Sequence, residues 1–352
     1  MKVDRIVLLT GANGHLGRNI VQQLAAQGVR VRGLVLPGEK APLLEEDNIE
    51  IVRGDVTDPG SLQPLFAGLE NREVVVIHTA AVIDISSKVT QRARRVNVDG
   101  TKNVVALALQ HKVHRFIHVS SVHAIPEAAG RRTIRETKDF SPDTVSGSYA
   151  KTKAEASAFV MQQIQENGLP GVIMHPSGIA GPLDSGTNNI VAAIKGYLNG
   201  RIPACPRGGY DIVDVRDVAA ACISAIDGGR VGETYILSSR HYEFTELFAM
   251  LREVTGKKKK RCPVIPIWIA RLAAPVLERS AKRKKELPLI TPYSLETLAS
   301  NDNFCHEKAS RELGFWPRDI YETLQDTVAW LDEQKQLKKA RQQRRKVAKA
   351  GA

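Results

Sequence analysis

Short apolar runs alternate with segments of helical periodicity along the first half of the chain. Runs with the length and composition of buried strands lie at residues 6–10, 29–36, 49–52, 74–78, 116–121 and 172–175. Apolar residues at helical spacing follow at 20–25, 96–109 and 149–166. Parallel strands need crossover connections, so this alternation predicts an α/β fold, a Rossmann-type doubly wound parallel sheet.

The pattern becomes irregular after about residue 180, with more Pro and Gly and with helices expected at 188–198, 218–226 and 245–254. We therefore predict a dinucleotide-binding domain at 1–180. A smaller, partly interwoven lobe at 181–334 is expected to close over it and to bind the substrate. Residues 335–352 carry eight Lys or Arg and no acid, out of a net charge of +12, which predicts a disordered tail or a frayed helix.

The first apolar run leads directly into three glycines, Gly11, Gly14 and Gly17, followed by a helical pattern. This order of strand, tight turn and helix N-terminus is the context in which a glycine loop holds a pyrophosphate on free backbone amides. The loop residues Asn13, His15 and Leu16 join the glycines as candidate cofactor contacts. The glycine loop thus predicts a dinucleotide site, but it does not indicate which reaction the site catalyses.

Composition narrows the class of protein. The four cysteines are scattered without a CxxC pair, which favours free thiols in a reducing compartment over disulfides or a metal site. No apolar run approaches the length needed to span a bilayer, and the first strand leaves no room for a signal peptide. We expect a cytoplasmic protein. The basic tail suggests contact with nucleic acid or an anionic surface, or simply a solubilising extension.

Tyr149 and Lys153 lie one helical turn apart, downstream of the Ser120-Ser121 strand end. A free tyrosine is a poor acid or base at neutral pH. A nearby ammonium, together with an oxidised nicotinamide, is expected to lower its pKa. Ser121 is expected to hydrogen-bond the same substrate oxygen. These three residues are the candidate catalytic set.

These motifs resemble the extended short-chain dehydrogenases/reductases of the NAD-dependent epimerase/dehydratase superfamily, and the resemblance covers roughly residues 1–182. The pieces that carry it, in order, are Thr10–Gly17, Gly54–Val56, His78–Ala81, Asn97–Thr101, Ser120–Ser121, Tyr149–Lys153 and His175–Pro182. A looser match continues through 213–219 and 308–317. The resemblance implies further cofactor contacts from Asp55, Val56, Ala80, Ala81, Asn97, Tyr149, Lys153 and Pro176. It also implies that Ser121 is catalytic and Ser120 structural.

Within the superfamily, the His-Pro-Ser-Gly-Ile turn at 175–179 and the segment 264–272 look more like the dihydroflavonol-reductase and 3β-hydroxysteroid-dehydrogenase-like branches. These imply an oxidoreductase that interconverts a secondary alcohol and a ketone on a small or medium hydrophobic substrate. Sugar-nucleotide epimerases and dehydratases with tightly bound NAD are the alternative. They commonly use an arginine to grip pyrophosphate where this chain has Tyr210, although Arg207 is a possible substitute. A non-catalytic dinucleotide sensor or a nucleic-acid-associated protein is a third hypothesis.

Several details are left open by the sequence. The second strand ends in Val35-Leu36-Pro37, with no acid for the ribose of NAD, which favours NADP(H) over NAD(H). Arg18, Arg32 and Lys40 are candidate partners for the 2′-phosphate.

No metal is expected, because His114 and His118 fall on a strand and not on a helix. The segment 264–272 is interpreted as lining a pocket, with an interfacial helix as the alternative. The resemblance suggests a homodimer built on 101–111 and 149–166.

Overall fold

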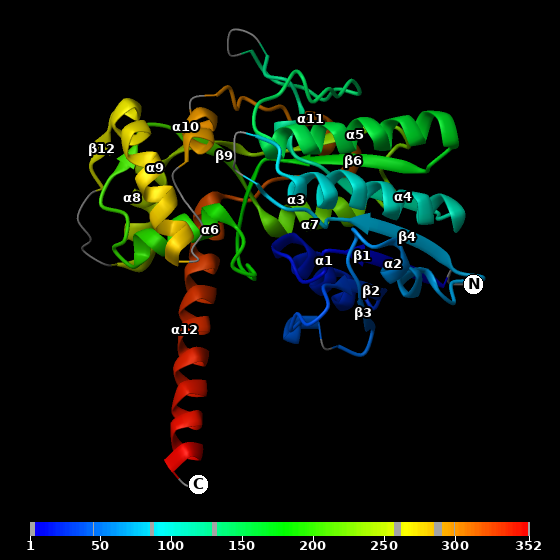
Figure 1. Cartoon of the computed structure of the whole chain (residues 1–352), viewed down its shortest axis with the longest axis horizontal. Helices are drawn as coiled ribbons and strands as arrows, with labels where there is room; N and C mark the ends of the chain where they lie inside the picture. Colours follow the sequence, from blue (N-terminus) through cyan, green and yellow to red (C-terminus); the bar gives the residue numbers. More distant parts are fainter. Residues whose placement is uncertain are drawn as a thin grey trace.

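A seven-stranded, all-parallel sheet forms the centre of the protein, which is described here from a computed structural model covering residues 4–44, 46–84, 88–128, 132–256, 262–284, 291–298 and 300–350. The strand order is β10-β6-β5-β4-β1-β2-β3 (Figure 1). The strands are β1 (Arg5–Thr10), β2 (Arg30–Val35), β3 (Ile49–Arg53), β4 (Glu73–His78), β5 (Arg115–Val119), β6 (Gly171–Pro176) and β10 (Thr234–Leu237). The predicted doubly wound sheet is confirmed.

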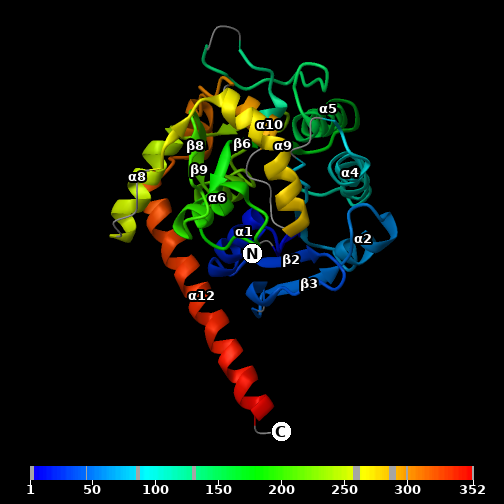
Figure 2. The same ribbon diagram turned by 60° about the vertical axis from the view of Figure 1, so that its left-hand side comes forward.

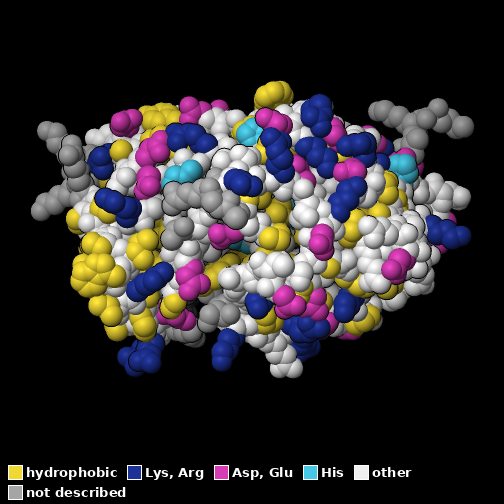
Figure 3. All heavy atoms as spheres, turned by 90° about the horizontal axis from the view of Figure 1, so that it is seen from above, with side chains coloured by type: hydrophobic (Ala, Val, Ile, Leu, Met, Phe, Trp, Pro, Cys, Tyr) yellow, Lys and Arg dark blue, Asp and Glu magenta, His cyan; other side chains and the backbone are white. Residues whose placement is uncertain are grey.

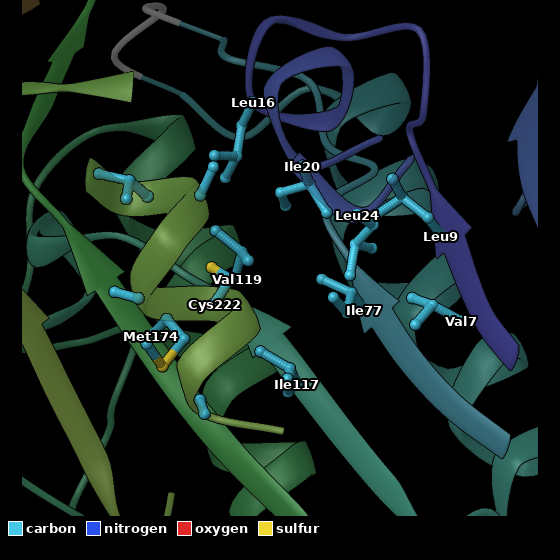
Figure 4. Packing of buried hydrophobic residues seen from close by; sticks show 14 of the residues in the cluster. Val7, Leu9, Leu16, Ile20, Leu24, Ile77, Ile117, Val119, Met174 and Cys222 are labelled. Carbon is cyan, nitrogen blue, oxygen red and sulfur yellow. The ribbon is translucent and has the colours of Figure 1, made fainter. Parts of the chain in front are cut away.

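Helices cover both faces of this sheet. One face carries α1 (His15–Ala26), α7 (Val215–Ser224) and α11 (Glu307–Leu313). The other carries α2 (Pro59–Phe66), α4 (Gly100–Gln110) and α5 (Ser148–Asn167). Figure 4 shows the first face, where Leu16, Ile20 and Leu24 of α1 meet side chains from the strands and Cys222 from α7. Each large aliphatic side chain buried there contributes about 1.5–3 kcal/mol of transfer free energy.

A helical stretch of unusual geometry precedes α4. It begins as α3 (Gln91–Arg94) and widens into a π-helical turn, η2 (Arg95–Asp99), before α4 continues it. Two short 3-10 helices lie elsewhere, η1 (Pro42–Leu44) and η3 (Val122–Ala124). A π-helical turn is rare and frequently marks a functional position.

The second lobe is built around two small sheets, ordered β11-β9-β7 and β12-β8. Their strands are β7 (Gly178–Ala180), β8 (Cys205–Pro206), β9 (Gly209–Asp214), β11 (Arg240–Glu243) and β12 (Val264–Ile265). The helices of this lobe are α6 (Asn189–Leu198), α8 (Phe244–Thr255), α9 (Ile267–Lys284), α10 (Pro292–Thr297) and α12 (Ile320–Ala350). Helices α6, α8 and α12 share one hydrophobic cluster, and α9 and α10 share another.

The chain crosses between the two lobes more often than a boundary at residue 180 implies. Strand β10 pairs with β6 as the seventh strand of the central sheet, and α7 and α11 complete one of its faces. Strand β10 was not expected, because a four-residue apolar run carries no periodicity that separates a strand from part of a helix. Segments from both sides of residue 180 therefore build the central sheet and its helical layers, and the domain division stays a prediction.

Helix α12 extends away from the body and ends near the C-terminus (Figure 1). Residues 335–350 continue it as helix, which is the second of the two alternatives expected from composition. The segment is rich in Lys, Arg, Gln and Ala, which are good helix formers.

Candidate active site

A cleft of about 2120 Å³ lies at the carboxyl ends of the central strands, between the sheet and the second lobe. One wall consists of the glycine loop and the segments that follow β2, β3, β4, β5 and β6. The opposite wall consists of residues from α6, α8, α9 and α10. Doubly wound sheets bind ligands at this edge, so the strand ends and the lobe enclose the expected site.

The glycine loop packs as a pyrophosphate cradle requires. Gly11 has φ +70°, and a Cβ there would lie 2.8 Å from Thr79 Oγ1. A Cβ on Gly17 would lie 2.1 Å from the Gly11 carbonyl oxygen, so glycine allows α1 to approach the turn closely. Gly14 is the N-cap of α1 and lines the cleft, and no side chain of the described residues caps that helix end. The amides of the first turn are therefore placed to hold an anion.

Most other predicted cofactor residues also line the cleft. These are Asn13, His15, Leu16, Asp55, Val56, Ala80, Ala81 and Pro176, as well as Tyr149 and Lys153. The imidazole Nε2 of His15 lies 3.2 Å from the carbonyl oxygen of Gly181 and 3.0 Å from that of Pro182. Its Nδ1 lies 3.1 Å from the amide nitrogen of Asn188. His15 thus joins the glycine loop to the second lobe.

Asn97 is placed differently from the other predicted contacts. It is buried, lies in the π-helical turn η2 and is not among the residues that line the cleft. Its amide accepts a hydrogen bond from the backbone N–H of Val82 (2.8 Å) and donates to the Val82 carbonyl (3.0 Å) and to Thr152 Oγ1 (3.0 Å). Asn97 therefore fixes the loop after β4 to helix α5, in keeping with a supporting role, and does not contact the cleft directly.

The three candidate catalytic residues meet on the cleft wall. Tyr149 and Lys153 lie in the first turns of α5, and Ser121 follows β5 and accepts a hydrogen bond from the His123 backbone N–H. Lys153 Nζ donates to the Val119 carbonyl at 2.8 Å. The Ser120 hydroxyl pairs with Ser157 Oγ at 2.7 Å in a buried contact, which favours a structural role for this serine.

The expected lowering of the Tyr149 pKa depends in part on an oxidised nicotinamide, and the protein's own groups do not supply it. Burial raises the pKa of Tyr149 to about 12, against the opposing effect of a hydrogen bond with Ser121. Burial also lowers the pKa of Lys153 to about 8. Both side chains are enclosed, and the loss of hydration disfavours the charged form of each. Tyr149 is therefore a neutral phenol at pH 7, able to give a proton.

Aromatic rings flank Tyr149. His123, in η3, lies edge-on to it with ring centroids 6.2 Å apart. The ring of Tyr293, from α10, lies 6.4 Å from that of His123 and packs over Gly147. Gly147 precedes α5 at φ +90°, and a Cβ there would lie 2.1 Å from the Tyr293 ring. Tyr293 and Gly147 were missed because only the fold brings residues so distant in sequence together.

Two further carboxylates in the cleft were also missed. Glu39, just beyond β2, lines the end of the cleft where an adenosine ribose is expected. Asp211 is buried beside Ser177, whose hydroxyl donates to it at 2.5 Å, and burial raises the pKa of this carboxyl to about 6. Neither carries a local sequence signal, since each belongs to an ordinary polar stretch.

Two of the three candidate phosphate partners have other contacts. Arg32 is buried and donates to Glu50 Oε2 (2.8 Å) and to the carbonyls of Leu65 (3.0 Å) and Ala67 (2.7 Å), so it serves the fold and is wrong as a 2′-phosphate ligand. Arg18 holds the Asn13 side chain at 2.9 Å. Glu39 brings an acid to this end of the cleft, and the preference for NADP(H) over NAD(H) stays a prediction.

Tyr210 occupies the position where sugar-nucleotide epimerases commonly have a pyrophosphate-binding arginine. Its hydroxyl donates to the Ser294 carbonyl at 3.0 Å, and its ring meets Phe244 edge-on within the cleft wall. Arg207 is exposed and is not a lining residue, so it does not replace the missing guanidinium. Basic lining residues in this lobe are the exposed Lys195 and Arg201.

Within the part of the chain that the structure describes, no three His, Cys, Asp or Glu side chains gather as a metal site. His118 lies in β5, stacked on His78 with ring centroids 5.7 Å apart, and is fully enclosed. No described helix has the length and hydropathy to cross a membrane.

Sequence comparison places this geometry among known proteins. The model described as "NAD dependent epimerase/dehydratase family" matches residues 7–238. Sterol demethylase protein B of Methylococcus capsulatus is 31% identical over 332 residues, covering 93% of this chain and 98% of that protein. A putative dihydroflavonol 4-reductase of Synechocystis is 28% identical (92% and 93% covered), and a 3-beta-hydroxysteroid dehydrogenase of Mycolicibacterium neoaurum is 28% identical (88% and 87%).

Among solved structures, the crystal structure of gox2253 aligns with a TM-score of 0.79 at 30% identity, covering 94% of this chain and 98% of that one. The relatives thus include both branches that the sequence motifs resembled.

Proposed function

The chain belongs to the NAD dependent epimerase/dehydratase family, and on that premise we propose that it is an oxidoreductase that interconverts a ketone and a secondary alcohol on a hydrophobic substrate. Its relatives are dehydrogenases, reductases and epimerases that act on CH–OH or ketone groups. The observation that carries the proposal is the meeting of Ser121, Tyr149 and Lys153 in the cleft that also contains the glycine loop.

The glycine loop, Asp55 and the alanines after β4 would hold the dinucleotide along the sheet edge, with Pro176 beside the nicotinamide. A nicotinamide bound there would supply or accept the hydride. Tyr149, a neutral phenol at pH 7, gives its proton to the carbonyl oxygen during reduction. Ser121 hydrogen-bonds that oxygen, and Lys153 stabilises the phenolate that remains. In the oxidation direction, the positive charge of the oxidised nicotinamide ring would lower the pKa of Tyr149, which the protein's own groups do not do.

The chemistry of the cleft walls supports a hydrophobic substrate. The second lobe contributes several large apolar and aromatic side chains, interspersed with polar ones: Ile190, Phe244, Phe248, Ile265, Leu277, Tyr293 and Leu295. Burying such surface against a ligand contributes roughly 25 cal/mol per Å². Tyr210 replaces the cation that would grip a nucleotide pyrophosphate, which favours a ketone or alcohol over a sugar nucleotide.

Reduction of a panel of hydrophobic ketones by Tyr149→Phe tests the mechanism. We expect turnover to fall by roughly 10²–10⁴-fold while the dinucleotide Kd changes little, because only the transferable proton is removed. Ser121→Ala should lose turnover, whereas Ser120→Ala, the neighbouring hydroxyl that faces the interior, should keep it. Equal turnover in wild type and Tyr149→Phe would refute the assignment.

The epimerase alternative makes a different prediction about the purified protein. It requires NAD that stays bound through turnover and UDP-sugars that react without added cofactor. Titration with NAD(H) and NADP(H) separates the two hypotheses and identifies the cofactor. Glu39→Gln should weaken NAD(H) binding if its carboxylate accepts the ribose 2′-OH.

We further propose a homodimer through α4 and α5, the faces expected from the family resemblance. Four free cysteines, three of them buried, support a reducing compartment such as the cytoplasm. Deletion of residues 335–352 tests whether the basic end of α12 retains nucleic acid or anionic surfaces, with unchanged turnover as the expected companion result.

A further inference from the structure

Helix α9 presents an unusual run of large apolar side chains to solvent. Trp268, Leu272 and Val276 are 64%, 74% and 67% exposed, and Ile269 is 38% exposed. At 100° per residue these four fall within about a third of the helix circumference. A contiguous apolar face of this kind on a soluble domain marks an interaction surface.

The other sides of α9 are accounted for. Ala270 and Ala274 are buried against α10, in a cluster with Leu295 and Leu298. Ala273, Leu277 and Ser280 line the active-site cleft. Figure 2 shows α9 crossing the front of the molecule beside α10. The helix therefore separates the cleft from the surface on which its apolar face lies.

Cations accompany this apolar face. Arg271, Arg279 and Arg283 are exposed on α9, and Glu278 is its one acidic residue. In the sequence, five consecutive basic residues at 257–261 precede the helix and four at 282–285 overlap its end. Figure 3 shows hydrophobic side chains gathered at the end of the molecule where α8, α9 and β12 lie, with Lys and Arg beside them.

From this geometry we propose that α9 docks on an anionic lipid surface, with its apolar face in the interface and its arginines among the headgroups. A helix that combines Trp and Leu on one face with flanking cations lies in a membrane interface and does not cross it. Since the adjacent face of the same helix lines the cleft, a docked α9 places the cleft wall against the lipid. The docking itself does not depend on the reaction catalysed.

The charges favour lipid over a second copy of the chain. In a symmetric dimer through α9, each copy would bring the same basic surroundings to the contact, and like charges would face each other. An anionic bilayer neutralises these cations instead. Each Lys or Arg near such a surface strengthens binding by roughly fivefold.

Vesicle binding by the full chain tests the proposal. Sucrose-loaded vesicles of phosphatidylcholine with and without phosphatidylglycerol are sedimented with the Trp316→Phe protein, which removes the 75% exposed Trp316 and leaves Trp268 as the exposed indole. We expect binding to the anionic vesicles, a blue shift of Trp268 emission and quenching by brominated lipid. Leu272→Ser with Val276→Ser should weaken binding by roughly tenfold or more, since each partly inserted aliphatic is worth up to about a tenfold change.

Matched variants decide the interpretation. Val231→Ser with Leu337→Ser removes two exposed aliphatics outside α9 (53% and 44% exposed) and should leave binding unchanged. Arg279→Gln with Arg283→Gln should reduce binding to anionic vesicles only. Wild type that ignores all vesicles, or binding lost on deleting 335–352 but kept in Leu272→Ser with Val276→Ser, overturns the proposal. The proposal is also overturned if Leu272→Ser with Val276→Ser abolishes self-association of the protein and leaves lipid binding unchanged. Thermal melting confirms that each variant is folded.

Discussion

Alanine substitutions at Gly14 and Gly17 should separate the two roles of the glycine loop. Gly17 lies inside α1, where alanine is normally favoured over glycine by about 1 kcal/mol. Here its Cβ would lie 2.1 Å from the Gly11 carbonyl oxygen and 2.9 Å from backbone atoms of Ala12. Helix and turn must separate by about 1 Å or more to relieve that contact, and overpacking of this kind costs about 1–3 kcal/mol, occasionally more.

At Gly14 the same methyl group meets much less protein. Its φ is −74°, and the added Cβ would contact the Gly11 oxygen at 3.1 Å, which needs an adjustment of a few tenths of an ångström. Gly14 faces the cleft at the N-terminus of α1, where a phosphate has to approach the backbone closely. Gly14→Ala should therefore keep its stability within about 1 kcal/mol of wild type but bind the dinucleotide roughly tenfold or more weakly.

Urea unfolding and calorimetric titration with NAD(H) and NADP(H) measure both quantities. Gly17→Ala should lose about 2 kcal/mol or more of unfolding free energy, so that the helix preference for alanine is reversed. Wild-type stability in Gly17→Ala would refute the close approach of α1 to the turn. Unchanged affinity in Gly14→Ala would show that the pyrophosphate does not lie on this helix end.

Three other predictions concern buried polar groups. Asn97→Ala should lower the unfolding free energy measured in urea by about 2 kcal/mol or more, because the substitution leaves buried backbone and hydroxyl groups unpaired. A change of less than about 0.5 kcal/mol, the size expected of an ordinary surface substitution, would contradict this prediction. Burial lowers the pKa of Lys153 to about 8, so above that pH the unfolded chain binds more protons than the folded one. The unfolding free energy of wild type should therefore rise by about 2–3 kcal/mol relative to that of Lys153→Met between pH 8 and 10. Above pH 10 the raised pKa of Tyr149 acts in the opposite direction. Burial lowers the pKa of His123 and His175 to about 4. Each histidine should therefore lower the unfolding free energy by up to about 2 kcal/mol as the pH falls from 6.5 to 5. In His123→Phe the unfolding free energy should fall less steeply over this pH range.

The sequence sufficed where function depends on short contiguous motifs. The glycine loop, Tyr149 and Lys153 could be located because strand, turn and helix periodicity place them on one sheet edge. Tyr293, Asp211 and Glu39 could not, because their position in the cleft depends on how distant segments fold back. The effect of burial on the Tyr149 pKa could not be foreseen either, since proximity of a lysine is visible in the sequence but enclosure is not.

The late return of β10 to the central sheet has a consequence for synthesis of the protein. Strand β6 leaves the ribosome more than fifty residues before β10, its hydrogen-bonded neighbour. Until β10 arrives, β6 is an exposed edge made of apolar residues, the kind of edge that pairs with other chains. Nascent chains arrested between residues 180 and 230 should therefore depend most on chaperones, and the finished sheet is protected only after part of the second lobe has been translated.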